Sequence, residues 1–301
     1  MKIKKGFVIF LIAMAISAVL FFVKTDEIPK SETGIPTTTQ SADVPTTAEK
    51  PAAKAPVYRM PKGLKGKVCA VLLFVDDEES FWTAKEAAKY EKEKIQPGIA
   101  FIMEQAASYG AELDLSSVSY VTTEDRPIYY DGIIGTNFTI RQENGKPRYY
   151  SDHSKNTGLD KIIERVAANW GFASVNEFNQ AMLDYTGAER IGYVVIANKR
   201  GWANASCSYA KSPGGGEPTE TYFPHEFLHL FAAEDLYTAT KMDGTVQRKN
   251  RAAMTEKLHR NAIMYSKTAD VDDAIVCPYN AYHVGWLEEM PEVYNCEEWY
   301  S

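Results

Sequence analysis

Eight consecutive apolar residues at positions 68–75 limit the possible folds of this chain more than any other feature. The run, VCAVLLFV, ends at Asp76 and Asp77, and a short apolar run bounded in this way predicts a β-strand that is buried on both faces. A strand of this kind belongs to a central sheet. We therefore expect helices to pack against that sheet.

The residues after this strand predict both helices and further strands. Apolar side chains at 99, 102, 103 and 106 form one stripe of a helix that Gly110 would end. Residues 113–121 alternate between apolar and polar side chains, which predicts a half-buried strand. The expected elements are helices at about 80–94, 97–109, 159–170 and 175–185 and strands at 68–75, 113–121 and 191–197, with a tyrosine-rich turn tract that extends to about 150.

Seventeen uncharged and mostly apolar positions at 7–23 follow Lys2, Lys4 and Lys5. This order predicts an export signal that is inserted with its N-terminus in the cytoplasm. A helix of this length spans roughly 26 Å, against a ~30 Å hydrocarbon core, so length does not separate an anchor from a cleaved signal. Because the run ends without a small-x-small cleavage site, we expect residues 1–23 to form an uncleaved signal anchor, a single-pass transmembrane helix at the cell membrane with the C-terminal domain outside. Cleavage would instead yield a secreted protein.

Residues 24–56 carry five prolines among Thr, Ser, Ala and Lys and almost no large apolar side chains. This composition predicts an extended, solvated backbone, and we expect a Pro/Thr-rich disordered linker. The folded domain is then expected at residues 57–301.

The overall charge and the cysteines argue against several classes of function. Lys and Arg total 33 against 40 Asp and Glu, for a net charge of −7, and no basic stripe of the kind that follows a phosphate backbone is present. We therefore expect no nucleic-acid partner. The cysteines at 69, 207, 277 and 296 form no C-x-x-C pair, which gives no support to a four-thiolate zinc site or a redox dithiol. Their disulfide connectivity is left open.

Residues 225–229 have the pattern H-E-x-x-H. On a helix, side chains at i and i+4 are neighbours, so His225 and His229 can each present an imidazole nitrogen to one metal ion about 2.0–2.1 Å away. Pro224 is tolerated in a first helical turn, which predicts that the helix begins a few residues upstream. Glu226 would lie beside the metal rather than on it, within reach of a water, which is the position of a general base.

A catalytic zinc ion needs a third protein ligand and one position open for water. Asp235 lies ten residues after His225, which matches the extended pattern H-E-x-x-H-x-x-G-x-x-H with aspartate in the final place. Glu234 is the nearest alternative, and the third ligand stays open between these two residues.

These residues resemble the metzincin-type zinc metallopeptidases in their HExxHxxxxxD variant, and are similar to bacterial immune inhibitor A-like and snapalysin-like peptidases. The resemblance implies that His225, His229 and Asp235 bind one catalytic Zn²⁺ and that Glu226 is the catalytic base. It also implies that Met264 lies in a tight turn beneath the metal as structural support.

The resemblance is carried by motifs between about 220 and 290, and one residue departs from the family pattern. The family has a glycine where this chain has Ala232, at the point where the backbone leaves the helix towards the third ligand. A left-handed alanine costs roughly 1 kcal/mol or more, so the path of the chain to Asp235 is open at this stage.

The fold class that the resemblance implies is α+β, a metzincin-like zinc peptidase domain. It would have a mixed sheet with packed helices above an active-site helix, in an N-terminal subdomain at about 57–235, and a small irregular C-terminal subdomain at about 236–301. Such a domain would be a zinc metalloendopeptidase, a hydrolase that cleaves peptide bonds of a protein or peptide substrate at the outer face of the membrane through a metal-activated water.

The alternative is a non-catalytic surface binding module or adhesin on a peptidase-like fold. Calcium has little support, because Asp270, Asp272 and Asp273 lack the glycine and the distal glutamate of a calcium-binding loop. We expect these aspartates to form a solvated acidic turn.

Overall fold

The sheet is built around strand β1 (Gly66–Val75), whose residues from Val68 onwards are all buried. The computed structural model describes residues 63–134, 138–143, 146–151, 159–199, 204–205, 209–213, 220–236, 246–265 and 271–294. The predicted anchor at 1–23 and the predicted linker at 24–56 lie outside these residues. Within the described part of the chain, no helix is both long and apolar enough to cross a membrane.

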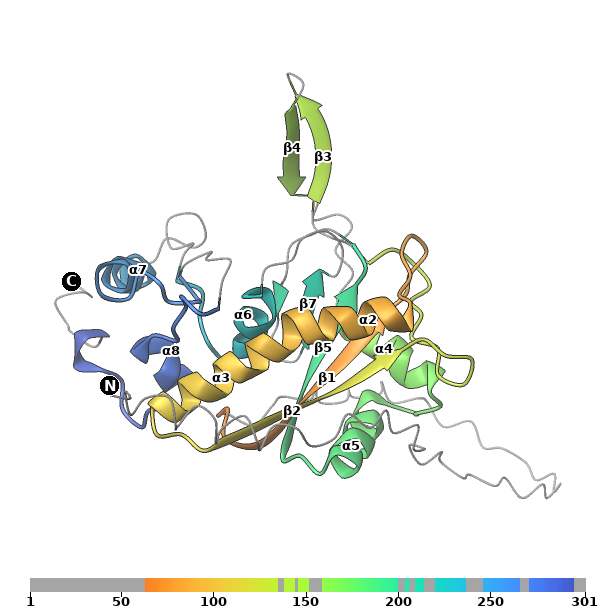
Figure 1. The fold of residues 1–301 in the computed structure, drawn as a ribbon, viewed down its shortest axis with the longest axis horizontal. Helices are drawn as coiled ribbons and strands as arrows, with labels where there is room; N and C mark the ends of the chain where they lie inside the picture. Colours follow the sequence, from red (N-terminus) through yellow and green to blue (C-terminus); the bar gives the residue numbers. More distant parts are fainter. Residues whose placement is uncertain are drawn as a thin grey trace, which may run out of the picture. The chain divides into compact units, whose positions relative to one another are not determined.

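The five strands of the sheet lie in the order β2-β1-β5-β7-β6. β1 pairs in parallel with β2 (Leu113–Val121) and β5 (Arg190–Ala197), β5 pairs in parallel with β7 (Tyr209–Pro213), and the short β6 (Asn204–Ala205) runs antiparallel to β7. The predicted strands at 68–75, 113–121 and 191–197 are confirmed, and the sheet is mixed. With its helices it makes an α+β fold (Figure 1).

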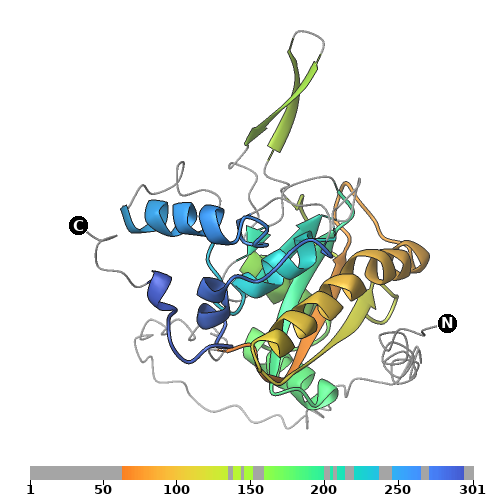
Figure 2. The same cartoon turned by 60° about the vertical axis from the view of Figure 1, so that its left-hand side comes forward.

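Helices lie on both faces of the sheet (Figures 1 and 2). Successive side chains of a strand point to opposite faces. Leu72 of β1 and Val194 of β5 belong to the main core, together with residues of α3 (Gln96–Ser108) and α6 (Tyr222–His229). The neighbouring Tyr193 stacks on Phe178 of α5 (Val175–Thr186), with ring centroids 5.4 Å apart. Helix α4 (Leu159–Asn169) packs against α5, and both helices match their predicted ranges.

The predicted helices at 80–94 and 97–109 differ from the observed ones at their boundaries. Helix α2 (Ala84–Tyr90) begins later than expected, because Thr83 forms a capping box with Glu86. The chain then continues without a break through a π-helical segment (Glu91–Ile95) into α3. This wider turn precedes Pro97, which lacks a backbone N–H and lies in the first turn of α3.

Several observed elements were not predicted, including the strands β6 and β7. The tyrosine-rich tract contains an antiparallel hairpin of β3 (Phe138–Glu143) and β4 (Lys146–Ser151), and its sequence signal was the Asn-Gly pair at 144–145 between two runs of β-forming residues. Helix α7 (Val246–Leu258) was also missed, since its sequence is strongly polar. The last elements in the described part of the chain are α8 (Pro278–His283) and a 3₁₀ turn (Glu292–Tyr294).

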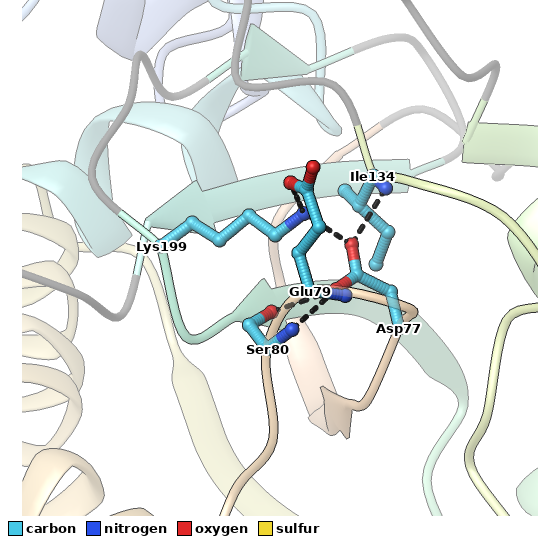
Figure 3. A network of polar contacts seen from close by, with 5 residues as sticks. All are labelled: Asp77, Glu79, Ser80, Ile134 and Lys199. Carbon is cyan, nitrogen blue, oxygen red and sulfur yellow. Dashed lines mark hydrogen bonds and ion pairs between the residues drawn. The ribbon is translucent and has the colours of Figure 1, made fainter.

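Asp77, just after β1, has a fully buried carboxylate at the centre of a polar network (Figure 3). Its Oδ1 accepts hydrogen bonds from the N–H groups of Glu79 and Ser80 and from the Ser80 hydroxyl, and its Oδ2 accepts one from the Ile134 N–H and pairs with Lys199. Burial by itself raises the pKa of Asp77, but Lys199 and these hydrogen bonds lower it below its usual value. The network joins the loops that follow β1 and β5.

The C-terminal residues share the main core with the sheet. Met264, Val276 and Trp286 belong to this core, and the indole N–H of Trp286 donates to the carbonyl oxygen of Leu64 at 2.8 Å. Tyr109 of α3 donates to the carbonyl oxygen of Val276 at 2.6 Å. The described residues accordingly form one compact unit, and the division into subdomains near 235 stays a prediction.

Of the four cysteines, two lie in the described residues. Cys69 of β1 and Cys277, which precedes α8, are both buried free thiols. The other two, Cys207 and Cys296, lie outside the described residues.

Candidate metal centre

The H-E-x-x-H motif lies on helix α6, which begins at Tyr222. Pro224 occupies its first turn, and the N–H of His225 donates to the carbonyl oxygen of Thr221 at 3.1 Å, so the proline removes no intrahelical hydrogen bond that the motif needs. The prediction that the helix begins just upstream of Pro224 is confirmed. Phe223 and Phe227 of this helix are buried in the main core.

Two glycines allow α6 to lie close to its neighbours. A Cβ placed on Gly98 of α3 would lie 2.7 Å from Cδ of Pro224, and one placed on Gly192 of β5 would lie 2.6 Å from Cε2 of Phe227. Any larger residue at these positions would push α6 outward. The position of the motif relative to the sheet therefore depends on glycine at both contacts.

Three side chains, two from α6 and one from the segment that follows it, come together. Oδ1 of Asp235 lies 3.2 Å from Nε2 of His225 and 3.2 Å from Nε2 of His229. Among the described residues, this is the one group of at least three His, Cys, Asp or Glu side chains with ligand atoms close enough to share a metal ion. The side chains keep 15%, 17% and 34% of their surface exposed, while the Oδ1 atom of Asp235 is itself buried.

The two imidazole rings are oriented by backbone carbonyl groups. Nδ1 of His225 lies 3.0 Å from the carbonyl oxygen of Ile263, and Nδ1 of His229 lies 2.8 Å from that of Ala233. A carbonyl oxygen can only accept, so each Nδ1 carries the proton. In the neutral imidazole, each Nε2 then has its lone pair available, and it faces Asp235.

The chain reaches Asp235 through a left-handed turn at Ala232, where φ is 77°. Ala232 is the one non-glycine residue with positive φ in the described part of the chain. The N–H of Ala233 donates to the carbonyl oxygen of Leu228 at 3.2 Å, which is the long hydrogen bond of a helix end with a left-handed residue at this position. The alanine that replaces the family's glycine thus adopts the conformation that the turn requires.

Glu234, the alternative third ligand, faces a different set of partners. Its Oε2 accepts a hydrogen bond from the hydroxyl of Tyr279 at 2.8 Å and pairs with Arg251 at 3.2 Å. The Arg251 guanidinium also lies over the Tyr279 ring, 5.0 Å from its centroid. Of the two neighbouring carboxylates, only that of Asp235 belongs to the group around the histidines.

The charges of the group act on one another. Burial by itself lowers the pKa of His229, but Asp235 and then Glu226 raise it above its usual value. Burial also favours the neutral form of Asp235, yet the two histidines hold its pKa far below its usual value. Asp235 is therefore a carboxylate near neutral pH, which is the form in which an aspartate can bind a metal ion.

Glu226 and Met264, the expected base and the expected supporting residue, are both buried. Glu226 is 6% exposed, and it is not part of the ligand group. Met264 is buried in the main core, and its carbonyl oxygen accepts a hydrogen bond from the N–H of Leu236 at 2.8 Å. The turn at 262–265 therefore contacts the candidate site twice, through His225 and through the residue after Asp235.

In the described part of the chain, the predicted acidic turn and the histidines at 259 and 283 belong to no group that could hold a metal ion. Asp272 and Asp273 are exposed and belong to no metal-binding group in the described part of the chain, while Asp270 lies outside it. His283 is close to Tyr279, with ring centroids 4.5 Å apart, and burial lowers its pKa. The contacts of Arg251, Tyr279 and Asn280 around Glu234 were not predicted, because no spacing in the sequence connects α7 and α8 with this residue.

Comparison with protein-family models and with curated protein sequences finds no match for this chain. The case for a function therefore depends on the residues of the site.

Proposed function

We propose that this protein is a zinc-dependent endopeptidase with a metzincin-like domain. The observation that carries the proposal is that Oδ1 of Asp235 lies 3.2 Å from Nε2 of both His225 and His229, and that Glu226, next to His225 in the same helix, is buried. The same three residues were the expected ligands, and Glu226 was the expected base.

The distances from Asp235 to the two histidines fit a shared zinc ion. Ligands about 2.0–2.1 Å from a tetrahedral zinc ion lie roughly 3.3 Å from one another. Both contacts of Asp235 with the histidines are within about 0.2 Å of this value. Two neutral nitrogen ligands and one carboxylate are also a common donor set for a catalytic zinc ion, which keeps its fourth position open.

Each residue of the site would then have its own role in peptide hydrolysis. When bound, zinc supplies a Lewis acid that polarises a carbonyl group and lowers the pKa of a water. The Glu226 carboxylate would take a proton from the attacking water and pass it to the leaving amine. Ile263 and Ala233 would hold the histidines in the tautomer that leaves Nε2 free of a proton. Residues 1–23 would keep this domain at the outer face of the membrane.

Zinc content and peptide cleavage of the full-length protein test the proposal. We expect one zinc ion per chain by elemental analysis, retained in Glu226→Gln and lost in His229→Ala, and cleavage of an unstructured protein substrate that stops with a chelator and in Glu226→Gln. Glu226→Gln is the matched variant, because it keeps the size of the side chain and removes the base. Zinc binding without cleavage of any substrate would favour the binding module, and absence of zinc would contradict the proposed site.

A further inference from the structure

The segment that carries Asp235 is held by hydrogen bonds on both of its sides. On one side, Leu236 donates its N–H to the carbonyl oxygen of Met264 at 2.8 Å. On the other side, the N–H of Glu234 donates to Oδ1 of Asn280 at 2.7 Å, and Nδ2 of Asn280 donates to the carbonyl oxygen of Glu234 at 3.2 Å. One side chain thus binds both backbone groups of the residue that precedes Asp235.

We propose that Asn280 is a positioning residue that aims the Asp235 carboxylate at the metal, and that Arg251 and Tyr279 withdraw the competing carboxylate of Glu234. This inference rests on the proposed zinc site. It concerns how the chain chooses one of two adjacent carboxylates as its third ligand.

Asparagine has the chemistry that this position needs. Its amide contains one acceptor oxygen and a donor nitrogen, so it can pair with a backbone N–H and a backbone C=O at the same time. Aspartate would lose the donor, and leucine would lose both groups while keeping a similar shape. Asn280 is fully buried, and it lies on α8 next to Tyr279, which is fully buried as well. The amide is therefore fixed by the core and does not depend on a flexible surface side chain.

A positioning residue is needed because the chain enters this segment through a strained turn. Ala232 has φ of 77°, a conformation that an alanine rarely adopts, and Asp235 follows three residues later. The hydrogen bonds from Asn280 to Glu234 and from Leu236 to Met264 fix the backbone on each side of Asp235. The direction of the Asp235 side chain is set by these contacts from α8 and from the turn at 262–265.

The hydrogen-bond and ion-pair partners of Glu234 favour Asp235 over Glu234 as the third ligand. Arg251 supplies a positive charge at 3.2 Å and Tyr279 a hydroxyl donor at 2.8 Å, both to Oε2 of Glu234. If the Glu234 carboxylate turned towards the histidines, it would leave the buried Tyr279 hydroxyl and the partly buried Arg251 guanidinium without this acceptor, which is unfavourable. Asn280 and Tyr279 are adjacent on α8, so the same short helix holds the backbone and the side chain of Glu234.

The test compares zinc affinity in Asn280→Leu with that in the wild type, by competition with a chromophoric chelator on the full-length protein. Partners that orient a metal ligand typically contribute 10–100-fold to metal affinity, and we expect a loss of about this size. Asn280→Asp, which keeps the volume and the acceptor, should lose less zinc affinity, and it replaces the leucine variant if that variant does not fold.

Tyr109→Phe is the matched control, because it removes a hydrogen bond to Val276 in the same C-terminal segment without a contact to Glu234. Its affinity should match that of the wild type.

A double-mutant cycle separates positioning from a general loss of structure. If Asn280 acts through Asp235, Asn280→Leu should change zinc affinity by no more than about twofold in an Asp235→Asn background. An equal loss in both backgrounds, or an unchanged affinity in Asn280→Leu, would overturn the inference. If the wild type binds zinc but cleaves nothing, the endopeptidase function fails while the affinity cycle still decides the role of Asn280. If the wild type binds no zinc, both are overturned.

Discussion

Nδ1 of His225 lies 3.0 Å from the carbonyl oxygen of Ile263, which is 38 residues further along the chain. This contact gives His225 the tautomer whose Nε2 faces Asp235. Ile263 precedes Met264, whose own carbonyl oxygen holds the N–H of Leu236. A single turn therefore sets the orientation of one proposed ligand and one end of the segment that carries another.

The two adjacent carboxylates should respond differently to neutralisation. Substitution of a residue that orients a metal ligand usually weakens metal binding about 10–100-fold. Asp235→Asn should weaken zinc binding by more than this, because it removes the carboxylate ligand itself. Glu234→Gln should keep zinc affinity within about tenfold, since its carboxylate pairs with Arg251 and Tyr279. The measurement is competition with a chelator for both variants side by side, and a larger loss in Glu234→Gln would make Glu234 the ligand.

Ala232→Gly should stabilise the metal-free protein. The left-handed conformation at φ of 77° costs an alanine energy that a glycine does not incur, and the exposed methyl group contributes little to packing. We expect the free energy of unfolding to rise by about 0.5–1 kcal/mol, measured by urea titration. Ala233→Gly is the control, because the next residue is buried and lacks positive φ, so glycine should destabilise there. A decrease in Ala232→Gly would contradict this account of the turn.

Gly192→Ala should disturb the metal centre through packing alone. The added methyl group would lie 2.6 Å from Phe227 and 3.0 Å from Leu230, so α6 must move away from β5. Overpacking of this kind typically costs about 1–3 kcal/mol of unfolding free energy, and we expect zinc affinity to fall as well. The unfolding free energy and the zinc affinity are measured in Gly192→Ala alone and in combination with Phe227→Leu, which makes room for the added methyl group. The two substitutions should be less damaging together than the sum of their separate effects.

Asp77→Asn should reduce stability in a way that depends on pH. The pKa of Asp77 is lower in the folded protein than its usual value of about 4, so its ionised form stabilises the fold above that pH. This stabilisation is lost as pH falls through the lowered pKa. We expect a deficit of about 2–4 kcal/mol at pH 7, because a buried ion pair with Lys199 loses one partner, and a smaller deficit at pH 3.

Glu79→Gln is the matched control for this experiment. Glu79 also pairs with Lys199, at 3.0 Å, but its side chain is 56% exposed. Exposed pairs contribute little, so its unfolding free energy should change by less than about 1 kcal/mol at either pH. A deficit of Asp77→Asn that does not change between pH 7 and pH 3 would show that the charge of Asp77 contributes nothing to stability.

Local signals in the sequence were sufficient for the main elements and for placing the two histidines of the candidate site on one helix. The uninterrupted apolar run at 68–75 predicted a strand buried on both faces, because a parallel strand covered by helices has no polar side. The i, i+4 spacing of His225 and His229 placed both rings on one face of a helix, since that spacing closes one turn. Each of these inferences depends on residues that are neighbours in the chain.

Other features could not be predicted from neighbouring residues. From the sequence, Asp235 was the expected third ligand, and Glu234, which is adjacent and carries the same charge, stayed open as the alternative. The tertiary structure separates them, because α7 and α8 bring Arg251, Tyr279 and Asn280 to Glu234 and leave Asp235 between the two imidazoles. Contacts between residues far apart in the chain determine which carboxylate faces the site, and no local pattern records them.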